Sequence, residues 1–337
     1  MIQEYGRFII TFSLLVAAAL AGFTVSPAAG QQDPLITNET LAMSWLVARV
    51  QGDWEAVDAV LAPDIIAYDP FLPQSLHGEE AVKSWMTAMS DAFSNLAFDI
   101  EHLVAEEDYV GIHCWIDGQF TKDYLGFPAT GAPVGWAEID ILRIEAGQIV
   151  ELWMGYDTMV LAQQLGVVPR EDETTGQQAD LPVDGAGEAA SSSDPEANKA
   201  LIRSFKFNLI NEQNFALVPD LVTPGFVFHD HGDTHDLSYS GYDGVQEWLG
   251  PLLAVVPDTH FLPEELLLVA GEDLVFVHWQ ALGTNSGNVP GITATGDELA
   301  VYGNSIYRVA DGKIAETWFA MDVFGFMQQL GVIPPLE

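Results

Sequence analysis

Apolar residues along the chain follow a helical period and then a strand period, and this order occurs twice. Segments 39–50 (ETLAMSWLVARV) and 196–210 (EANKALIRSFKFNLI) place apolar residues three and four positions apart, which predicts two helices. Asn38 and Asp194 are the predicted N-caps, and Pro195 follows the second at the first helical position. We expect a short turn and a second short helix after each.

Strand signals dominate the rest of each half. An early strand is predicted to end at IAYDP or FVFHD, and a third helix to begin near Gly78 or Gly241. Three β-rich segments should follow, which in the first half are AFDIEHLVAE, DYVGIHCWIDGQF and GWAEIDILRI.

Turn and cap residues complete the predicted order. Ala146–Gly147, matched by Asp311–Gly312, should form a tight turn into a last strand. Asp157 and Asp322 are then predicted to cap a terminal helix that ends at a glycine. Helices followed by an antiparallel meander indicate an α+β fold.

The two halves are copies of one another. The ending QQLGVVP at 163–169 returns as QQLGVIP at 328–334, 165 positions later. The same shift aligns the strands before it and gives the matched pairs Arg143/Arg308, Trp153/Trp318 and His113/His278. A repeat this long indicates one domain copied twice rather than a solenoid of short units.

A polar stretch separates the copies. Residues 170–193 are rich in Gly, Ser, Ala and acids and lack apolar periodicity, so we expect a flexible acidic linker. The predicted domains are therefore 34–169 and 194–335.

The order of elements, and especially the pattern FPATG…IDILRIEAGQIVELW…D…QQLG, resembles the SnoaL-like polyketide cyclase family of the nuclear transport factor 2-like superfamily. The resemblance covers nearly all of both copies and is most specific in the C-terminal half of each. It implies a cone in which a curved antiparallel sheet wraps around helices and encloses an apolar pocket. It also implies intramolecular aldol chemistry without metal or cofactor, and pairing of the two cones through their sheets as an intrachain pseudo-dimer.

The chain departs from the family at the positions that the resemblance marks as catalytic. Met154 and Phe319 stand where the cyclases carry their acid–base Asp, and neither side chain can transfer a proton. The pocket His of the family falls on Asp140 in the first copy and Ser305 in the second. The family's early-strand Asn falls on Asp69 and Asp230.

Asp140 is the leading catalytic candidate on its own sequence context. Strand alternation in WAEIDILRI places Trp136, Glu138 and Asp140 on one face, where two carboxylates could share a proton and one pKa would rise. The alternative is an acidic strand face in contact with solvent. His113 and His278 are the matched histidines, and each is either a pocket-facing base or oxyanion donor or a satisfied core residue.

These considerations give one set of candidate site residues. The catalytic candidates are Asp140 as acid–base group, assisted by His113 and Asp69; the binding candidates are Glu138, Trp136, Met154, His278, Ser305, Phe319 and Asp230. The stretch FHDHGDTHD at 228–236 is rich in metal-ligand atoms, but its spacing matches no known metal motif, so no metal or other cofactor is expected.

Two functions remain open, with a purely structural tandem domain as a further alternative. The first is a cofactor-free cyclase or isomerase that acts on a small apolar carbonyl compound. The second is a non-catalytic binder of small apolar molecules with degenerate cyclase pockets.

The net charge and the N-terminal segment limit the expected binding partners and localisation of the protein. The 337 residues carry 49 Asp and Glu against 11 Lys and Arg, a net charge of −38, which excludes binding to nucleic acid or anionic lipid. Arg7, an apolar run at 8–23 and the small residues before Gly30 predict a signal peptide over residues 1–30, hence a secreted or periplasmic protein, with an uncleaved anchor as the alternative. Cys114 is the only cysteine and forms no internal disulfide.

Overall fold

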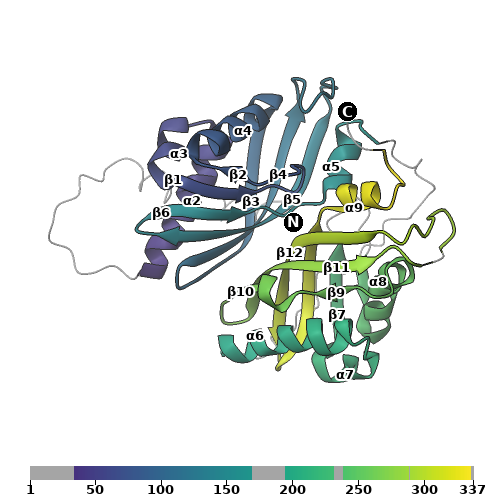
Figure 1. Cartoon of the computed structure of the whole chain (residues 1–337). Helices are drawn as coiled ribbons and strands as arrows, with labels where there is room; N and C mark the ends of the chain where they lie inside the picture. The colour runs from purple at the N-terminus through teal and green to yellow at the C-terminus, as the bar shows by residue number, and fades with distance from the viewer. Residues whose placement is uncertain (1–33, 169–193, 231–237, 288, 335–337) are drawn as a thin grey trace, which may run out of the picture. The chain divides into compact units, whose positions relative to one another are not determined.

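A computed structural model describes residues 34–168, 194–230, 238–287 and 289–334 of the chain (Figure 1). The predicted signal peptide, the predicted linker and most of the FHDHGDTHD stretch lie outside these described residues. Among the described residues, no helix combines the length and the apolar character needed to cross a bilayer.

The first copy places its helices before most of its strands, as its pattern predicts. Its elements are α2 (Pro34–Gln51), α3 (Trp54–Val60), β1 (Leu61–Tyr68), β2 (Leu76–His77), α4 (Glu79–Ala92), β3 (Phe93–Glu106), β4 (Tyr109–Phe120), β5 (Pro133–Glu145), β6 (Gln148–Trp153) and α5 (Thr158–Gln164). In Figure 1 the helices α2, α3 and α4 gather against the sheet of this copy.

The second copy repeats this order with additional short elements. They are α6 (Pro195–Ser204), the π-helix η1 (Phe205–Asn211), η2 (Phe215–Leu217), α7 (Val218–Leu221), β7 (Val222–Asp230), β8 (Ser238–Ser240), α8 (Gly241–Val255), β9 (His260–Phe261), η3 (Pro263–Glu265), β10 (Leu267–Ala270), β11 (Leu274–Thr284), β12 (Glu298–Ala310), β13 (Lys313–Met321) and α9 (Val323–Gln329). The main difference from the first copy is the π-helix, which continues directly from α6.

The two sheets have the same topology. The first has strand order β2-β1-β6-β5-β4-β3, and the second has the order β10-β11-β12-β13-β7-β8, with β9 paired to β11. The sheets are antiparallel except for one pair in each, because β1 runs parallel to β6 and β7 runs parallel to β13. The early strand of each copy is therefore joined to the last strand of its meander, which brings the two ends of each domain together.

Most of the predicted caps are present and one is wrong. Asp194 accepts hydrogen bonds from the backbone of Glu196 and Ala197, and Asp157 and Asp322 cap their helices in the same way. Asn38 is not an N-cap, since α2 begins at Pro34 and the Asn38 amide donates to the carbonyl of Glu107 instead.

Each copy has its own apolar core, and a third cluster contains residues of both. The third cluster joins Val104, Ile139 and Ile141 of the first copy to residues of the second, namely Val269, Leu274, Phe276, Ile306, Trp318 and Ala320. All of these lie on the sheet faces opposite to the faces that cover the cores of the individual copies. The described residues of both copies accordingly belong to one compact unit.

Candidate active site

Strand β5 carries the predicted polar face into the interior of the first copy. Trp136 packs in the core of this copy, while Ile139 faces the third cluster, so alternate residues point to opposite sides of the sheet. Glu138 and Asp140 are only 0% and 2% exposed. The alternative of an acidic face in contact with solvent therefore does not describe this strand.

A buried cation accompanies the two carboxyl groups. Arg49 of α2 is 1% exposed, and its NH2 lies 2.7 Å from Glu138 Oε1, while Trp136 Nε1 donates to Glu138 Oε2 at 3.1 Å. Burial raises the pKa of Glu138, but the charge of Arg49 together with hydrogen bonds from Asp140, Trp136 and Arg49 outweighs burial and holds that pKa below its usual value. Burial and the neighbouring Glu138 both raise the pKa of Asp140 well above its usual value. The interior thus holds an Arg49–Glu138 ion pair that favours the ionised form of Glu138, beside Asp140, whose protonated form is favoured by burial and by that charge.

Asp69 adds a third carboxyl group to the same interior. It lies directly after β1, is 2% exposed, and accepts hydrogen bonds from the Tyr156 hydroxyl and the Phe71 amide, both at 2.8 Å. Burial raises the pKa of Asp69 to about 7, although the two hydrogen bonds lower it. Glu138 also raises this pKa, so the two carboxyl groups sense each other's charge. A carboxyl group that titrates near pH 7 suits a general base.

This interior contains a small cavity. A cavity of about 10 Å³ lies beside Arg49 and Trp136, room for roughly one water molecule. Met154 is 3% exposed and packs in the same core. A ligand of several heavy atoms would have to displace side chains in order to occupy this cavity.

The structure does not bring His113 to Asp140. On β4 the residues Ile112 and Cys114 face the core of the first copy, so His113 lies on the other face of the sheet. His113 packs there against Trp318 of the second copy, with ring centroids 6.0 Å apart. We therefore leave His113 out of the acid–base group.

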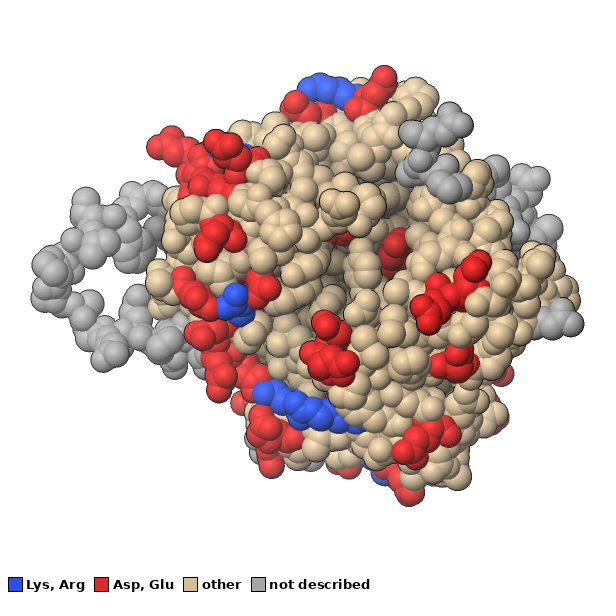
Figure 2. Space-filling view, in the orientation of Figure 1, with Lys and Arg blue, Asp and Glu red and all other residues tan. Residues whose placement is uncertain are grey.

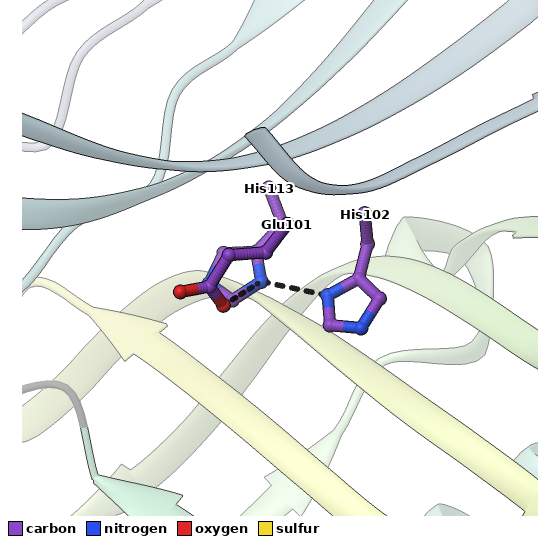
Figure 3. Close-up of side chains that lie close together, drawn as sticks. All are labelled: Glu101, His102 and His113. Atoms are coloured by element: carbon purple, nitrogen blue, oxygen red, sulfur yellow. Dashed lines mark hydrogen bonds and ion pairs between the residues drawn. The ribbon is translucent and has the colours of Figure 1, made fainter. Parts of the chain in front are cut away.

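His113 instead belongs to a cluster with Glu101 and His102 (Figure 3). The two Nδ1 atoms lie 3.0 Å apart, and Glu101 Oε2 lies 3.3 Å from His113 Nδ1. Arg308 NH2 lies 2.9 Å from His102 Nε2, so this nitrogen accepts a hydrogen bond and the proton of His102 is on Nδ1, facing His113. Burial, and then the charge of Arg308, lower the pKa of His102 to about 4. A proton held between the two rings, with a guanidinium beside them, makes this a hydrogen-bonded pair and a poor cation ligand.

The interior of the second copy has different chemistry. Ser305, at the position of Asp140, accepts a hydrogen bond from Trp279 Nε1 at 2.7 Å. Phe319 stacks on Trp279, with ring centroids 5.0 Å apart. The side chain of Asp230 lies outside the described residues, although its backbone pairs with Phe319.

Lys206 is a further candidate functional residue, which the sequence analysis did not identify. It lies in the π-helix η1, is fully buried, and its Nζ has no hydrogen-bond partner among the described residues. Three aromatic rings surround the amine, at 4.0 Å from Phe261, 5.1 Å from Trp279 and 5.5 Å from Tyr307. Burial lowers the pKa of Lys206 well below its usual value. The signal available in the sequence was a lysine between Phe205 and Phe207 in a predicted helix. The structure adds that this segment is a π-helix, an element often found at functional sites.

His278 occupies the face that corresponds to that of His113. Leu274 and Phe276 of the same strand belong to the third cluster, and His278 lies 5.7 Å from Trp153 of the first copy between ring centroids. The matched histidines thus lie on the sheet faces through which the two copies touch, outside both cone interiors.

The surface is strongly acidic. In the view of Figure 2, Asp and Glu side chains are scattered over the visible face and Lys and Arg side chains are few. This distribution agrees with the net charge of −38.

Comparison with known proteins gives matches at the level of single copies. Solved structures that resemble the chain include TsrD from Streptomyces laurentii, with 25% identity over 41% of this chain and 100% of that one, at a TM-score of 0.37. A candidate SnoaL-like polyketide cyclase from Jannaschia sp. CCS1 has 17% identity over 42% of this chain and 100% of that one, at a TM-score of 0.38. No curated protein gives a significant match.

The family comparison covers most of the chain. The model of the SnoaL-like polyketide cyclase family matches residues 40–165 and again residues 200–330. The two matches agree with the duplication seen in the sequence, while the finer boundaries at 34–169 and 194–335 remain predictions. The chain belongs to the SnoaL-like polyketide cyclase family and contains two tandem copies of its domain.

Proposed function

We propose that the first copy is a cofactor-free acid–base catalyst of the cyclase or isomerase type, acting on a small apolar carbonyl compound. One observation carries this proposal: its apolar interior holds Asp69, with a pKa of about 7, and Asp140, whose pKa lies well above the usual value. Two carboxyl groups with separated pKa values can divide the roles of base and acid. Asp69 then removes a proton from carbon, and Asp140 gives a proton to oxygen.

The charged pair beside them has a positioning role. Arg49 keeps Glu138 ionised, and ionised Glu138 keeps the proton on Asp140. The substitution of the family Asp by Met154 is then compensated by carboxyl groups from other positions of the same interior. The second copy, with Ser305 in place of Asp140, is a ligand pocket or a stabilising partner in this proposal.

Exchange of the α-protons of phenylacetone in D2O, followed by proton NMR, tests the catalytic proposal. The full chain should accelerate exchange, and Asp69→Asn should reduce the protein-catalysed rate by about 10²-fold or more. Asp140→Asn should reduce it as well. Because Asp69 must be ionised to accept a proton, the rate should rise as the pH increases through about 7.

The control is Asp53→Asn, which alters an exposed N-cap of α3 and should leave the exchange rate unchanged, since Asn caps helices as well as Asp does. Equal rates in Asp69→Asn and the unaltered chain would contradict the acid–base assignment. The binding alternative then predicts a small molecule that remains bound in native mass spectrometry and is lost in Asp140→Asn.

We also propose that the two copies pair as an intrachain pseudo-dimer. The contacts of Ile139, Phe276 and Trp318 in the third cluster support it, as do the hydrogen bonds from Asn304 Nδ2 to the carbonyls of Ile139 at 2.6 Å and Trp153 at 3.1 Å. Small-angle scattering of the full chain should fit one compact particle at all salt concentrations. Scattering from two independent, mobile beads would contradict the pairing.

A further inference from the structure

Two related sites lie where the sheets of the copies touch. The 165-residue shift relates Trp153 to Trp318 and His278 to His113. Each tryptophan faces the histidine of the other copy, at 5.7 Å for Trp153 and His278 and 6.0 Å for Trp318 and His113. We call the place around Trp318 and His113 the histidine site, and the place around Trp153 and His278 the groove. The two sites differ in which groups lie beside the tryptophan ring.

In the histidine site a cation of the protein itself lies beside the tryptophan. The guanidinium of Arg308 is 5.6 Å from the Trp318 ring centroid, within cation–π range. Its NH1 donates to Asp273 Oδ2 at 2.6 Å, its NH2 donates to His102 Nε2 at 2.9 Å, and its Nε lies 3.7 Å from Glu316 Oε1. An aromatic face, an imidazole lone pair and two carboxylates together hold this cation.

The groove is arranged differently. Leu267 stands at the position that corresponds to His102 and offers no acceptor. Arg143, the counterpart of Arg308, pairs instead with Glu145 and with Glu151, where its Nε lies 2.6 Å from Oε2. The groove is open, with a cavity of about 480 Å³. That volume falls in the range of small-molecule sites, about 300–1,000 Å³.

The lining of the groove suits a cation. Aromatic rings are supplied by Tyr68, Tyr109, Trp153 and Tyr302, carboxylates by Glu151, Glu264 and Glu265, and no Lys or Arg is among the described residues that line it. Tyr68 stacks on Trp153, with ring centroids 5.8 Å apart and planes 4° from parallel. Burial raises the pKa of Tyr68, and the charges of Glu151 and Glu265 raise it further, so carboxylates of both copies make the potential there negative.

His278 adds a defined acceptor. The Asn304 amide nitrogen donates to two backbone carbonyls, so its Oδ1 faces His278 Nδ1 at 2.9 Å and accepts a hydrogen bond from it. The proton of the neutral ring is therefore on Nδ1, and Nε2 carries a lone pair. Burial lowers the pKa of His278 to about 4, so the ring is neutral at physiological pH. The groove thus contains the same three kinds of group that hold Arg308: the aromatic ring of Trp153, the lone pair on His278 Nε2 and the glutamate carboxylates of the lining.

We propose that the groove binds an organic cation with N–H groups, a protonated amine or guanidinium on an apolar body, which takes the position beside Trp153 that Arg308 takes beside Trp318. The apolar body would lie between Tyr68 and Leu267, and the N–H groups would face the carboxylates and His278 Nε2. This site is separate from the interior of the first copy and requires both copies.

Isothermal titration calorimetry of the full chain with phenethylammonium tests the proposal. At about 10 mM salt, where the Debye length is about 30 Å, phenethylammonium should bind saturably, and neutral phenylpropanol should bind at least about tenfold more weakly. Benzyltrimethylammonium should also bind more weakly, because it has no N–H to donate to His278 Nε2. Addition of salt should weaken binding of the cation and leave the alcohol unaffected.

Matched charge variants locate the site. The double variant Glu264→Gln/Glu265→Gln removes two exposed groove carboxylates and should weaken phenethylammonium binding at least about fivefold through lost charge attraction. The double variant Glu55→Gln/Glu212→Gln removes two exposed carboxylates elsewhere and should change binding less than about twofold. Equal effects of the two double variants, equal binding of phenylpropanol, or no saturable heat with phenethylammonium would each overturn the proposal. None of these readouts depends on catalysis by the first copy.

Discussion

Replacing Arg49 with Met is expected to lower the free energy of unfolding by about 3–5 kcal/mol, because removal of one partner leaves a buried charge without compensation. Glu138 is fully buried, and its ionised state depends on Arg49 at 2.7 Å. Without the guanidinium, the pKa of Glu138 should rise above its unfolded value, so folding would take up a proton. Relative to the unaltered chain, the variant should then lose least stability at low pH and progressively more as the pH rises through the raised pKa of Glu138. Urea unfolding at several pH values measures this.

Two comparisons separate this effect from simple loss of packing. Adding Glu138→Gln to Arg49→Met removes the unpaired charge and should restore most of the stability. Arg143→Met breaks a partly exposed pair with Glu151, whose loss should cost no more than about 1 kcal/mol. If the double variant is as unstable as Arg49→Met alone, the buried charge is not the cause.

Replacing Lys206 with Met should have the opposite effect and raise the free energy of unfolding by about 2–4 kcal/mol at neutral pH. The Lys206 amine is fully buried without a hydrogen-bond partner among the described residues, and Met has a similar length and packs well against aromatic rings. Burial lowers the pKa of Lys206 in the folded protein, whereas the unfolded chain keeps a value of about 10.4. At this residue the unfolded state therefore binds more protons, so the contribution of Lys206 to stability should rise with pH from its lowered folded-state pKa up to about 10.4.

The stability advantage of the Lys206→Met variant should accordingly shrink as the pH approaches that value. Lys199→Met is the matched control, because Lys199 is paired with Glu106 at 2.6 Å and Glu196 at 3.0 Å. Its replacement should not stabilise the protein. A Lys206→Met variant less stable than the unaltered chain would show that the amine has a partner that stabilises it.

The sequence predicted those features that repeat with a fixed period or follow a local rule. Duplication placed the two copies, and strand alternation put Trp136, Glu138 and Asp140 on one face, which the structure confirms as the interior face. Capping rules identified Asp194 and Asp157, since a cap depends on the next three residues. The prediction of Asn38 as an N-cap was wrong because the helix continues further toward the N-terminus than its apolar spacing indicates.

Other features depend on residues far apart in the chain. Apart from His113, the segment VGIHCWI has apolar residues on both faces of β4. One face is covered by the core of its own copy and the other by the second copy, so alternation could not show which way His113 points. Arg49 forms an ion pair with Glu138, which lies 89 positions further along the chain. Lys206 was overlooked because buried, unpaired lysines are rare.

The contact between the copies is made partly by counterpart residues that have become different. Phe276 of the second copy packs against its own counterpart, Gly111, and a Cβ atom added to Gly111 would lie 2.3 Å from the Phe276 ring. Likewise, the Asn304 amide donates a hydrogen bond to the carbonyl of its counterpart, Ile139. Two second copies would set phenylalanine against phenylalanine, and two first copies would leave a gap between glycines. Once the domains share a chain, each can change without the same change appearing in its partner. The fused protein has therefore lost self-complementarity, and neither copy alone should rebuild this contact as a homodimer.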